Sequence, residues 1–561
     1  MSRILLVEPN YKNKYPPIGL MKIATYHRNR GDIVEFYKGE APYTQIVKSD
    51  RVYITSMFTF QFDITVKTIQ HYMKYKHLNS VYIGGIAVTL LTEKFIAQTG
   101  ATKVLTGLLT DSSVLGYGDS VNIDELPLDY DILDDVSYVY PAGDNYFIHT
   151  TRGCPRGCEF CAVRILEPNF KTTNHILNQV RQIDEKYGPK RNLLIMDNNI
   201  LCSPKLAEIV DDIVALGFDK TPNYSRPNQF KLLMDKIERR IVYQVDYYML
   251  ITKTIDLLHE FSKRISRYEN VAKQYSDVYR QIVEATDKLS LLREYREYLT
   301  DIFDKYSSKT KMTRYVDFNQ GIDARLINPT TIAQLSKLPI RPFRLAFDSI
   351  DDADIFKNAT QLAIDSGLNH FSNYMLYNWT DEPKDLWKRI NIAISLYNQA
   401  EGLDGFSFPM KFAPIDETNR CFVGKHWNKK YLRAVNVIIN VTKGVVAKER
   451  DFFEEAFGKN ENEFLEILAM PDEFIRFRHF FRDNGLLSMW QEAYRKLTKS
   501  EKDELLHILS DMIDNPSILK QVHSTNVKRI LDYYFIHKSQ IDKEPDSITK
   551  IFEMLSKTSL E

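Results

Sequence analysis

The chain of 561 residues has few cysteines, no long hydrophobic run and no excess charge of either sign. Five cysteines are too few for a disulfide scaffold. No apolar run approaches the roughly 18 residues of a membrane-spanning helix. Lys and Arg number 74, as do Asp and Glu, which argues against a general nucleic-acid or anionic-membrane binder. Because the first residues form a strand pattern without a signal-peptide cleavage site, we expect a cytoplasmic protein without membrane contacts.

What is present is the composition of a multidomain globular protein, with 44% hydrophobic and 26% charged residues. Short apolar runs alternate with amphipathic stretches over the first 140 residues. Strands are predicted at 4–7, 33–37, 52–56 and 81–83, and a helix at 19–30. Such βαβ units predict a doubly wound, Rossmann-like or flavodoxin-like domain over 1–140, which ends in a polar linker. Its ligand crevice is expected at the carboxyl ends of the strands.

A second series of strands and helices follows. The strands are predicted at 146–148, 193–196, 315–318, 343–347, 372–377 and 406–410, with helices at 206–216, 330–338 and 384–397. Six strands with helical returns predict a partial or full β/α barrel, similar to a TIM barrel, over 141–219 and 313–424. Its chemistry would lie at the carboxyl ends of the strands.

The barrel is interrupted by a segment without glycine or proline, between Pro227 and Gly321. Apolar residues three and four apart predict long helices there. We expect an antiparallel helical hairpin as an insertion over 220–312, turning near residues 267–270. Its charges are mixed, so the hairpin is either a solvated outer face or an arm that grips a partner or substrate. The pattern from 425 to 561 predicts an all-α C-terminal domain, whose role the sequence does not indicate.

Three of the five cysteines, Cys154, Cys158 and Cys161, lie on one short stretch directly after a predicted strand. Three thiolates can hold three irons of a [4Fe–4S] cluster and leave the fourth iron open to a small molecule. Arg152 and Arg156 are expected to supply positive charge beside the thiolates. Two alternatives remain, inert thiols and structural zinc, although zinc usually takes four ligands in two separated pairs. The other cysteines, Cys202 and Cys421, lie far along the chain.

The C-x3-C-x2-C spacing, with Phe160 directly before the third cysteine, resembles the signature of the radical S-adenosylmethionine (SAM) superfamily. The resemblance implies that SAM binds the open iron, that an external donor such as flavodoxin or ferredoxin reduces the cluster, and that reductive cleavage yields a 5′-deoxyadenosyl radical. It also implies SAM contacts for Phe160, for Asp197, Asn198 and Asn199 after the second barrel strand, and for Arg325. Ordinary loop polarity and a surface arginine remain the alternative for the Asp197–Asn199 and Arg325 assignments.

The N-terminal domain adds a second resemblance, in the segment from Tyr15 to Tyr26 and in Gly84-Gly85 after a strand. Both are similar to cobalamin-binding-type domains fused to radical SAM barrels. No D-x-H-x-x-G motif is present, so either cobalamin binds without an axial histidine or the fold has lost it. Bulky Phe58, Phe60 and Phe62 would pack a corrin or fill its space, whereas His27 and His149 are expected to be structural or to lie behind the ligands.

The sequence therefore predicts a radical SAM enzyme, and a methyltransferase if cobalamin binds. Two other classes stay open, a non-catalytic Fe–S redox or regulatory protein and a zinc-binding interaction scaffold. The substrate and the catalytic residue beyond the cofactors are unknown, and no nucleic-acid motif is apparent.

Overall fold

A computed structural model describes residues 1–541 and 547–557 and divides the chain into two compact units. The first unit contains residues 1–320, 329–341 and 414–420, and the second contains 321–328, 342–413 and the chain from 421 onward. None of the described helices is long and apolar enough to cross a bilayer.

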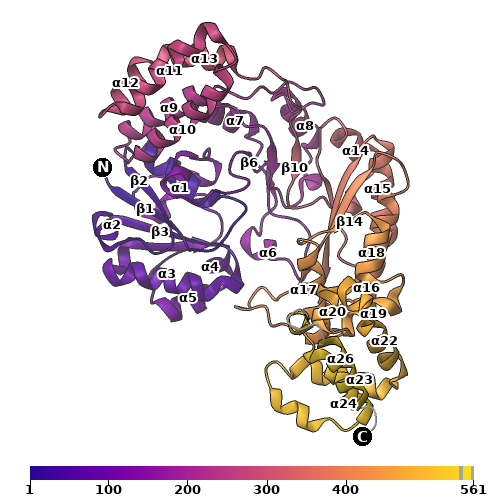
Figure 1. The fold of residues 1–561 in the computed structure, drawn as a ribbon. Helices are drawn as coiled ribbons and strands as arrows, with labels where there is room; N and C mark the ends of the chain where they lie inside the picture. The colour runs from indigo at the N-terminus through magenta and orange to yellow at the C-terminus, as the bar shows by residue number, and fades with distance from the viewer. Residues whose placement is uncertain (542–546, 558–561) are drawn as a thin grey trace. The chain divides into compact units, whose positions relative to one another are not determined.

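The first unit begins with a five-stranded parallel sheet in the order β2-β1-β3-β4-β5, the flavodoxin-like arrangement. Its strands are β1 (Arg3–Glu8), β2 (Ile33–Lys38), β3 (Arg51–Ser56), β4 (Val81–Gly85) and β5 (Lys103–Leu105). Its helices are α1 (Ile18–Asn29), α2 (Tyr43–Lys48), α3 (Phe62–Tyr75), α4 (Ile86–Leu90) and α5 (Thr92–Thr99). Helix α1 covers one face of the sheet and α3 and α5 the other (Figure 1). The four predicted strands are all present, and β5, a short and partly exposed strand, is an addition.

A three-stranded parallel sheet follows in the same unit, in the order β10-β9-β6. It consists of β6 (Tyr146–Ile148), β9 (Leu193–Ile195) and β10 (Val316–Phe318), with α7 (Ile176–Tyr187), α8 (Leu206–Ala215) and α14 (Pro329–Leu335). The N-terminal domain contacts this sheet through Tyr15, whose hydroxyl donates to Asn319 Oδ1 at 2.7 Å. The Tyr15 ring also meets the Phe147 ring edge-on.

Between α8 and β10 the chain forms five helices, so the prediction of a two-helix hairpin is too simple. They are α9 (Gln229–Val242), α10 (Tyr248–Ile265), α11 (Glu269–Glu284), α12 (Lys288–Glu294) and α13 (Arg296–Tyr306). The turn expected near 267–270 joins α10 to α11. The other breaks need neither glycine nor proline: Gln244 adopts φ +56° after α9, and the Asp287 side chain caps α12. A shared core of buried residues from all five helices, including Phe230, Phe261 and Phe303, makes the insertion a folded layer.

This helical layer is fixed to the N-terminal domain by an acidic stretch of the linker, residues 129–135. Asp129 pairs with Arg28 of α1 at 2.6 Å. On the insertion side, Asp131 pairs with Arg239 at 2.8 Å and Asp135 with Arg240 at 2.5 Å. Since Arg240 is only 4% exposed, these pairs hold the insertion against the linker over a buried surface.

The second unit contains the remaining strands of the predicted barrel. Parallel strands β11 (Phe343–Ala346), β12 (His370–Tyr377) and β13 (Asp404–Lys411) form a sheet with α15 (Ala353–Asp365) and α16 (Pro383–Tyr397). The six strands therefore form two sheets, one in each unit. A short antiparallel strand, β14 (Val446–Ala447), pairs with β13 inside the region predicted to be all helical, because its backbone completes the edge of that sheet.

The other elements described in the second unit are helices, as expected. Its helices are α17 (Lys429–Val441), α18 (Arg450–Phe457), α19 (Glu461–Ala469), α20 (Asp472–Arg476), α21 (Arg478–Asp483), α22 (Leu486–Lys496), α23 (Lys499–Asp511), α24 (Thr525–Leu531), α25 (Lys538–Ile541) and α26 (Ser547–Lys557). Trp490 and Leu505 lie in their buried core.

Candidate functional site

The three cysteines lie on a closed loop, residues 151–172, which begins three residues after the end of β6. Two short antiparallel strands, β7 (Thr151–Arg152) and β8 (Lys171–Thr172), pair at its base, and α6 (Val163–Leu166) lies within it. Cys154, Cys158 and Cys161 are half-buried, and none is in a disulfide. The amide of Cys161 donates to the Cys158 carbonyl at 3.1 Å, which turns the chain between these two thiols.

The first turn of the loop requires glycine. Gly153 has φ +74°, and a Cβ placed there would lie 2.5 Å from the Asn169 carbonyl oxygen. The two ends of the loop therefore touch backbone to backbone at Gly153, closer than any other residue allows.

Glu167 ties the two ends of the loop together. Its Oε2 accepts hydrogen bonds from the Gly153 amide at 2.7 Å and from the Asn198 side-chain amide at 3.0 Å. Its Oε1 accepts from the Arg152 guanidinium at 3.1 Å. Arg152, expected to lend its charge to the thiolates, is thus paired with carboxylates instead.

The polar segment after β9 supports the loop from a second side. The Asp197 carboxylate accepts from the backbone amides of Thr150 and Thr151, at 2.7 and 3.0 Å, and from the Thr150 hydroxyl. Burial raises the pKa of Asp197 to about 6, although these hydrogen bonds favour the charged form. Asn199 directs its side-chain amide at the Cys154 sulfur, 3.7 Å away.

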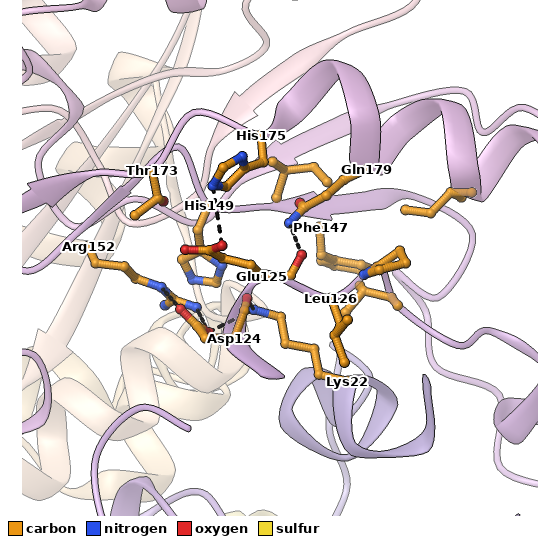
Figure 2. Close-up of a pocket in the computed structure, with 14 residues that line it drawn as sticks. Lys22, Asp124, Glu125, Leu126, Phe147, His149, Arg152, Thr173, His175 and Gln179 are labelled. Carbon is orange, nitrogen blue, oxygen red and sulfur yellow. Dashed lines mark hydrogen bonds and ion pairs between the residues drawn. The ribbon is translucent and has the colours of Figure 1, made fainter. Parts of the chain in front are cut away.

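Two residues from outside the predicted barrel complete the surroundings of the loop (Figure 2). Asp124 of the linker binds Arg152 through both carboxylate oxygens, at 2.5 and 2.9 Å. Lys22 of α1 donates to Asp124 Oδ1 at 2.8 Å. Burial opposes the charged form of Asp124, but the charges of Lys22 and Arg152 outweigh it and hold its pKa below the usual range. Burial lowers the pKa of Lys22 to about 8, so this chain of charges is intact at neutral pH.

A small cavity of about 10 Å³, close to the space one water needs, lies beside these charges. His149 lines it together with Thr173, His175 and Gln179. Burial, and then the charges of Arg152 and Lys22, lower the pKa of His149 well below its usual value, so its imidazole is neutral. His27 is buried between Asp32 and Tyr53, to which it bonds at 2.9 and 3.1 Å, as a structural histidine would be.

The structure connects four of the eight predicted site residues to the start of the loop through the contacts above: Cys154, Asp197, Asn198 and Asn199. Cys158, Phe160 and Cys161 belong to the same loop, where Phe160 is half-buried. Arg325 belongs to the second unit, in a single helical turn, and its Nε donates to Asp323 at 2.7 Å.

The chemistry of these residues fits a [4Fe–4S] cluster. The loop has three thiols that form no disulfide, Gly153 permits its tight turn, and the Asn199 side chain donates toward the Cys154 sulfur. Within residues 1–541 and 547–557, no three His, Cys, Asp or Glu side chains gather as ligands of a single metal ion. In a cubane cluster each thiolate bonds a different iron.

Sequence reasoning missed Glu167, Asp124 and Lys22. Glu167 follows the cysteine motif in a stretch without a pattern, and the other two lie in a different predicted domain. No signal short of the tertiary fold connects them to the loop.

Comparison with known families agrees with this geometry. The model of the radical SAM superfamily matches residues 148–289, from the last residue of β6 through the cysteine loop to the start of α12. No curated protein matches the chain. The match covers residues 148–289 only, so it shows that this part of the chain is similar to the radical SAM superfamily, whose members are enzymes that use a [4Fe–4S] cluster and SAM.

Proposed function

We propose that the chain is a radical SAM enzyme in which Cys154, Cys158 and Cys161 hold the cluster and Phe160, Asn198 and Asn199 contact SAM. The observation that carries the proposal is the closed, three-thiol loop after β6, within the residues that the superfamily model matches. When bound, the cluster and SAM supply a 5′-deoxyadenosyl radical that abstracts hydrogen from a substrate.

The residues of the chain position the cofactors. Asn199 donates toward the Cys154 sulfur, which stabilises negative charge on that thiolate. Asp197 holds Thr150 and Thr151, which fixes where the loop leaves β6. We assign Asp197 to this support, in addition to its predicted place beside SAM. Arg325, partly exposed on the second unit, remains the proposed partner of the SAM carboxylate.

Cobalamin fits the N-terminal domain poorly. A ligand of this fold binds beyond the carboxyl ends of β1 and β3. At the end of β1, the buried Glu8 carboxylate binds Asn13, Lys38 and Tyr140. At the end of β3, the Ser56 hydroxyl donates to the Gly84 carbonyl and accepts from the Val88 amide, both at 2.8 Å. These side chains occupy the crevice, so we propose a radical reaction without a methylcobalamin step.

The test of the proposal is anaerobic reconstitution with iron and sulfide, followed by dithionite, SAM and assay of 5′-deoxyadenosine. We expect 5′-deoxyadenosine from the wild-type chain and none from Cys154→Ala, whereas Cys421→Ala, an exposed cysteine outside the loop, should match the wild type. Zinc without iron or sulfide in the purified protein would instead favour the interaction scaffold. A cluster whose electron paramagnetic resonance (EPR) spectrum does not change when SAM is added would favour a redox or regulatory protein.

We propose that a reducing electron donor such as flavodoxin or ferredoxin supplies the electron that the superfamily chemistry requires. The substrate stays undefined, so the assay relies on the SAM cleavage that occurs without it.

A further inference from the structure

We propose that Glu167 is the positioning residue of the cysteine loop, and that the buried chain Lys22–Asp124–Arg152–Glu167 links it to the N-terminal domain. This inference rests on the proposed function, because it concerns how the same loop presents its cluster and SAM.

Glu167 is placed to act on both cofactors at once. One carboxylate oxygen, Oε2, receives the Gly153 amide, next to Cys154, and the Asn198 side chain, a proposed SAM contact. One carboxylate oxygen accepts from Gly153 and Asn198 and the other accepts from Arg152. The amide of glutamine has one accepting oxygen and one donor group, so its donor group must face one of these two sets of donors. No neutral isostere can therefore satisfy Gly153, Asn198 and Arg152 together.

The network is a balanced set of buried charges. Lys22 is 7% and Arg152 5% exposed, and the side chains of Asp124 and Glu167 are 10% and 13% exposed. Two cations alternate with two anions, and the removal of one member leaves an unpaired buried charge beside the loop. Since Lys22 lies on α1, the N-terminal domain takes part in holding the loop even without a ligand of its own.

The decisive variant is Glu167→Gln, and Glu159→Gln is its matched control. Glu159 lies in the same loop between Cys158 and Cys161 but is exposed. Both variants remove one negative charge near the cluster, so a difference between them reports the buried contacts of Glu167 and not the loss of charge alone.

Two measurements read the effect. In the apoprotein, hydrogen exchange of the Gly153 amide should accelerate at least tenfold in Glu167→Gln and stay at the wild-type rate in Glu159→Gln. In the reconstituted, reduced protein, the SAM concentration that half-converts the EPR spectrum should rise about tenfold or more in Glu167→Gln, the loss expected for a hydrogen bond to a charged group. Glu167→Asp, which keeps the charge, should recover part of that loss.

The inference is overturned if Glu167→Gln has wild-type exchange at Gly153 and wild-type SAM dependence. Should this variant hold no iron, the exchange measurement decides, since it needs no cluster. Should it fail to fold, Lys22→Met, which leaves the loop itself intact, must raise the half-converting SAM concentration above the wild-type value or the inference falls. A wild-type chain that yields no 5′-deoxyadenosine refutes the proposed function instead, which keeps the two failures apart.

Discussion

Gly153 is the residue of the cysteine loop for which the backbone leaves no substitute. A Gly153→Ala variant must accept a left-handed backbone and a contact of 2.5 Å with the Asn169 carbonyl. We expect a loss of at least about 2 kcal/mol in stability, from the sum of strain and clash. The measurement is thermal unfolding of the apoprotein, together with its iron content after reconstitution.

The same loop provides the control for that variant. Gly157 has nothing within 4 Å of an added Cβ, so Gly157→Ala should unfold at nearly the wild-type temperature. Equal losses in both variants would show that the loop tolerates no side chain anywhere, and the argument from Gly153 would fail.

At the same scale, the sequence identifies residues whose spacing indicates their chemistry. It does not identify residues whose role depends on contacts formed only in the tertiary structure. Cys154, Cys158 and Cys161 are recognisable because a cluster needs thiolates at short intervals. Glu167 and Lys22 are ordinary charged residues until tertiary structure places them at Arg152 and Asp124. Arg152 differs from these residues, because the sequence predicts that its charge lies near the cysteines but does not indicate that Asp124 and Glu167 bind it.

At the scale of elements, the helical insertion depends on Arg240 of α9. This guanidinium binds Asp135 at 2.5 Å and also donates to the carbonyls of Asp131 and Asp246. In an Arg240→Met variant Asp135 loses its buried partner, and the expected loss of stability is about 3–5 kcal/mol. Thermal unfolding and limited proteolysis between α9 and α13 would measure it.

Arg293 of α12 offers the matched exposed pair. It binds Glu238 at 2.8 Å, but 46% of its side chain is exposed. Arg293→Met should therefore cost no more than about 1 kcal/mol. If both variants proved equally mild, the linker contact would not be what holds the insertion.

A second element, α17 of the C-terminal domain, gives a prediction of pH dependence. Burial lowers the pKa of Lys430 from 10.5 to about 8, although Asp472 lies 2.7 Å from its ammonium. Between these values the folded chain has released the proton while the unfolded chain keeps it, so stability rises with pH. Relative to Lys430→Met, the wild-type chain should gain up to about 3 kcal/mol from pH 7 to 10.5.

Lys429, the next residue, serves as the control because its side chain is 43% exposed and its pKa is raised by Asp514. Its contribution is complete below pH 10.5 and is lost only above it. The difference between Lys429→Met and the wild type should therefore stay constant over this range. The same slope in both variants would contradict the burial argument.

At the scale of the whole molecule, alternating strands and helices were predicted well because each strand is a short apolar run that any parallel sheet buries. The five helices of the insertion were not, since the break at Gln244 and the cap at Asp287 carry no glycine or proline. The division into two units was also hidden. The boundary between the units separates β10 from β11. The insertion and the N-terminal domain belong to the same unit and meet through residues 129–135. The sequence does not indicate this contact, because the segments that make it lie far apart in the chain.

Under the proposed function, the N-terminal domain determines whether the reaction includes a methylcobalamin step. Tyr140 binds Glu8, which is fully buried at the end of β1, and Lys38 lies 4.5 Å from the centre of the Tyr138 ring. A corrin at this edge would have to displace the Glu8–Lys38 pair, at 2.5 Å, from its buried position. The cost of separating such a pair is several kcal/mol.

We therefore expect protein produced anaerobically with cobalamin supplied to show Fe–S absorption without corrinoid bands. A stoichiometric corrinoid would overturn this and make methyl transfer the reaction. A Tyr140→Phe variant, which removes only the hydroxyl on Glu8, should leave the iron content and the absence of corrinoid unchanged.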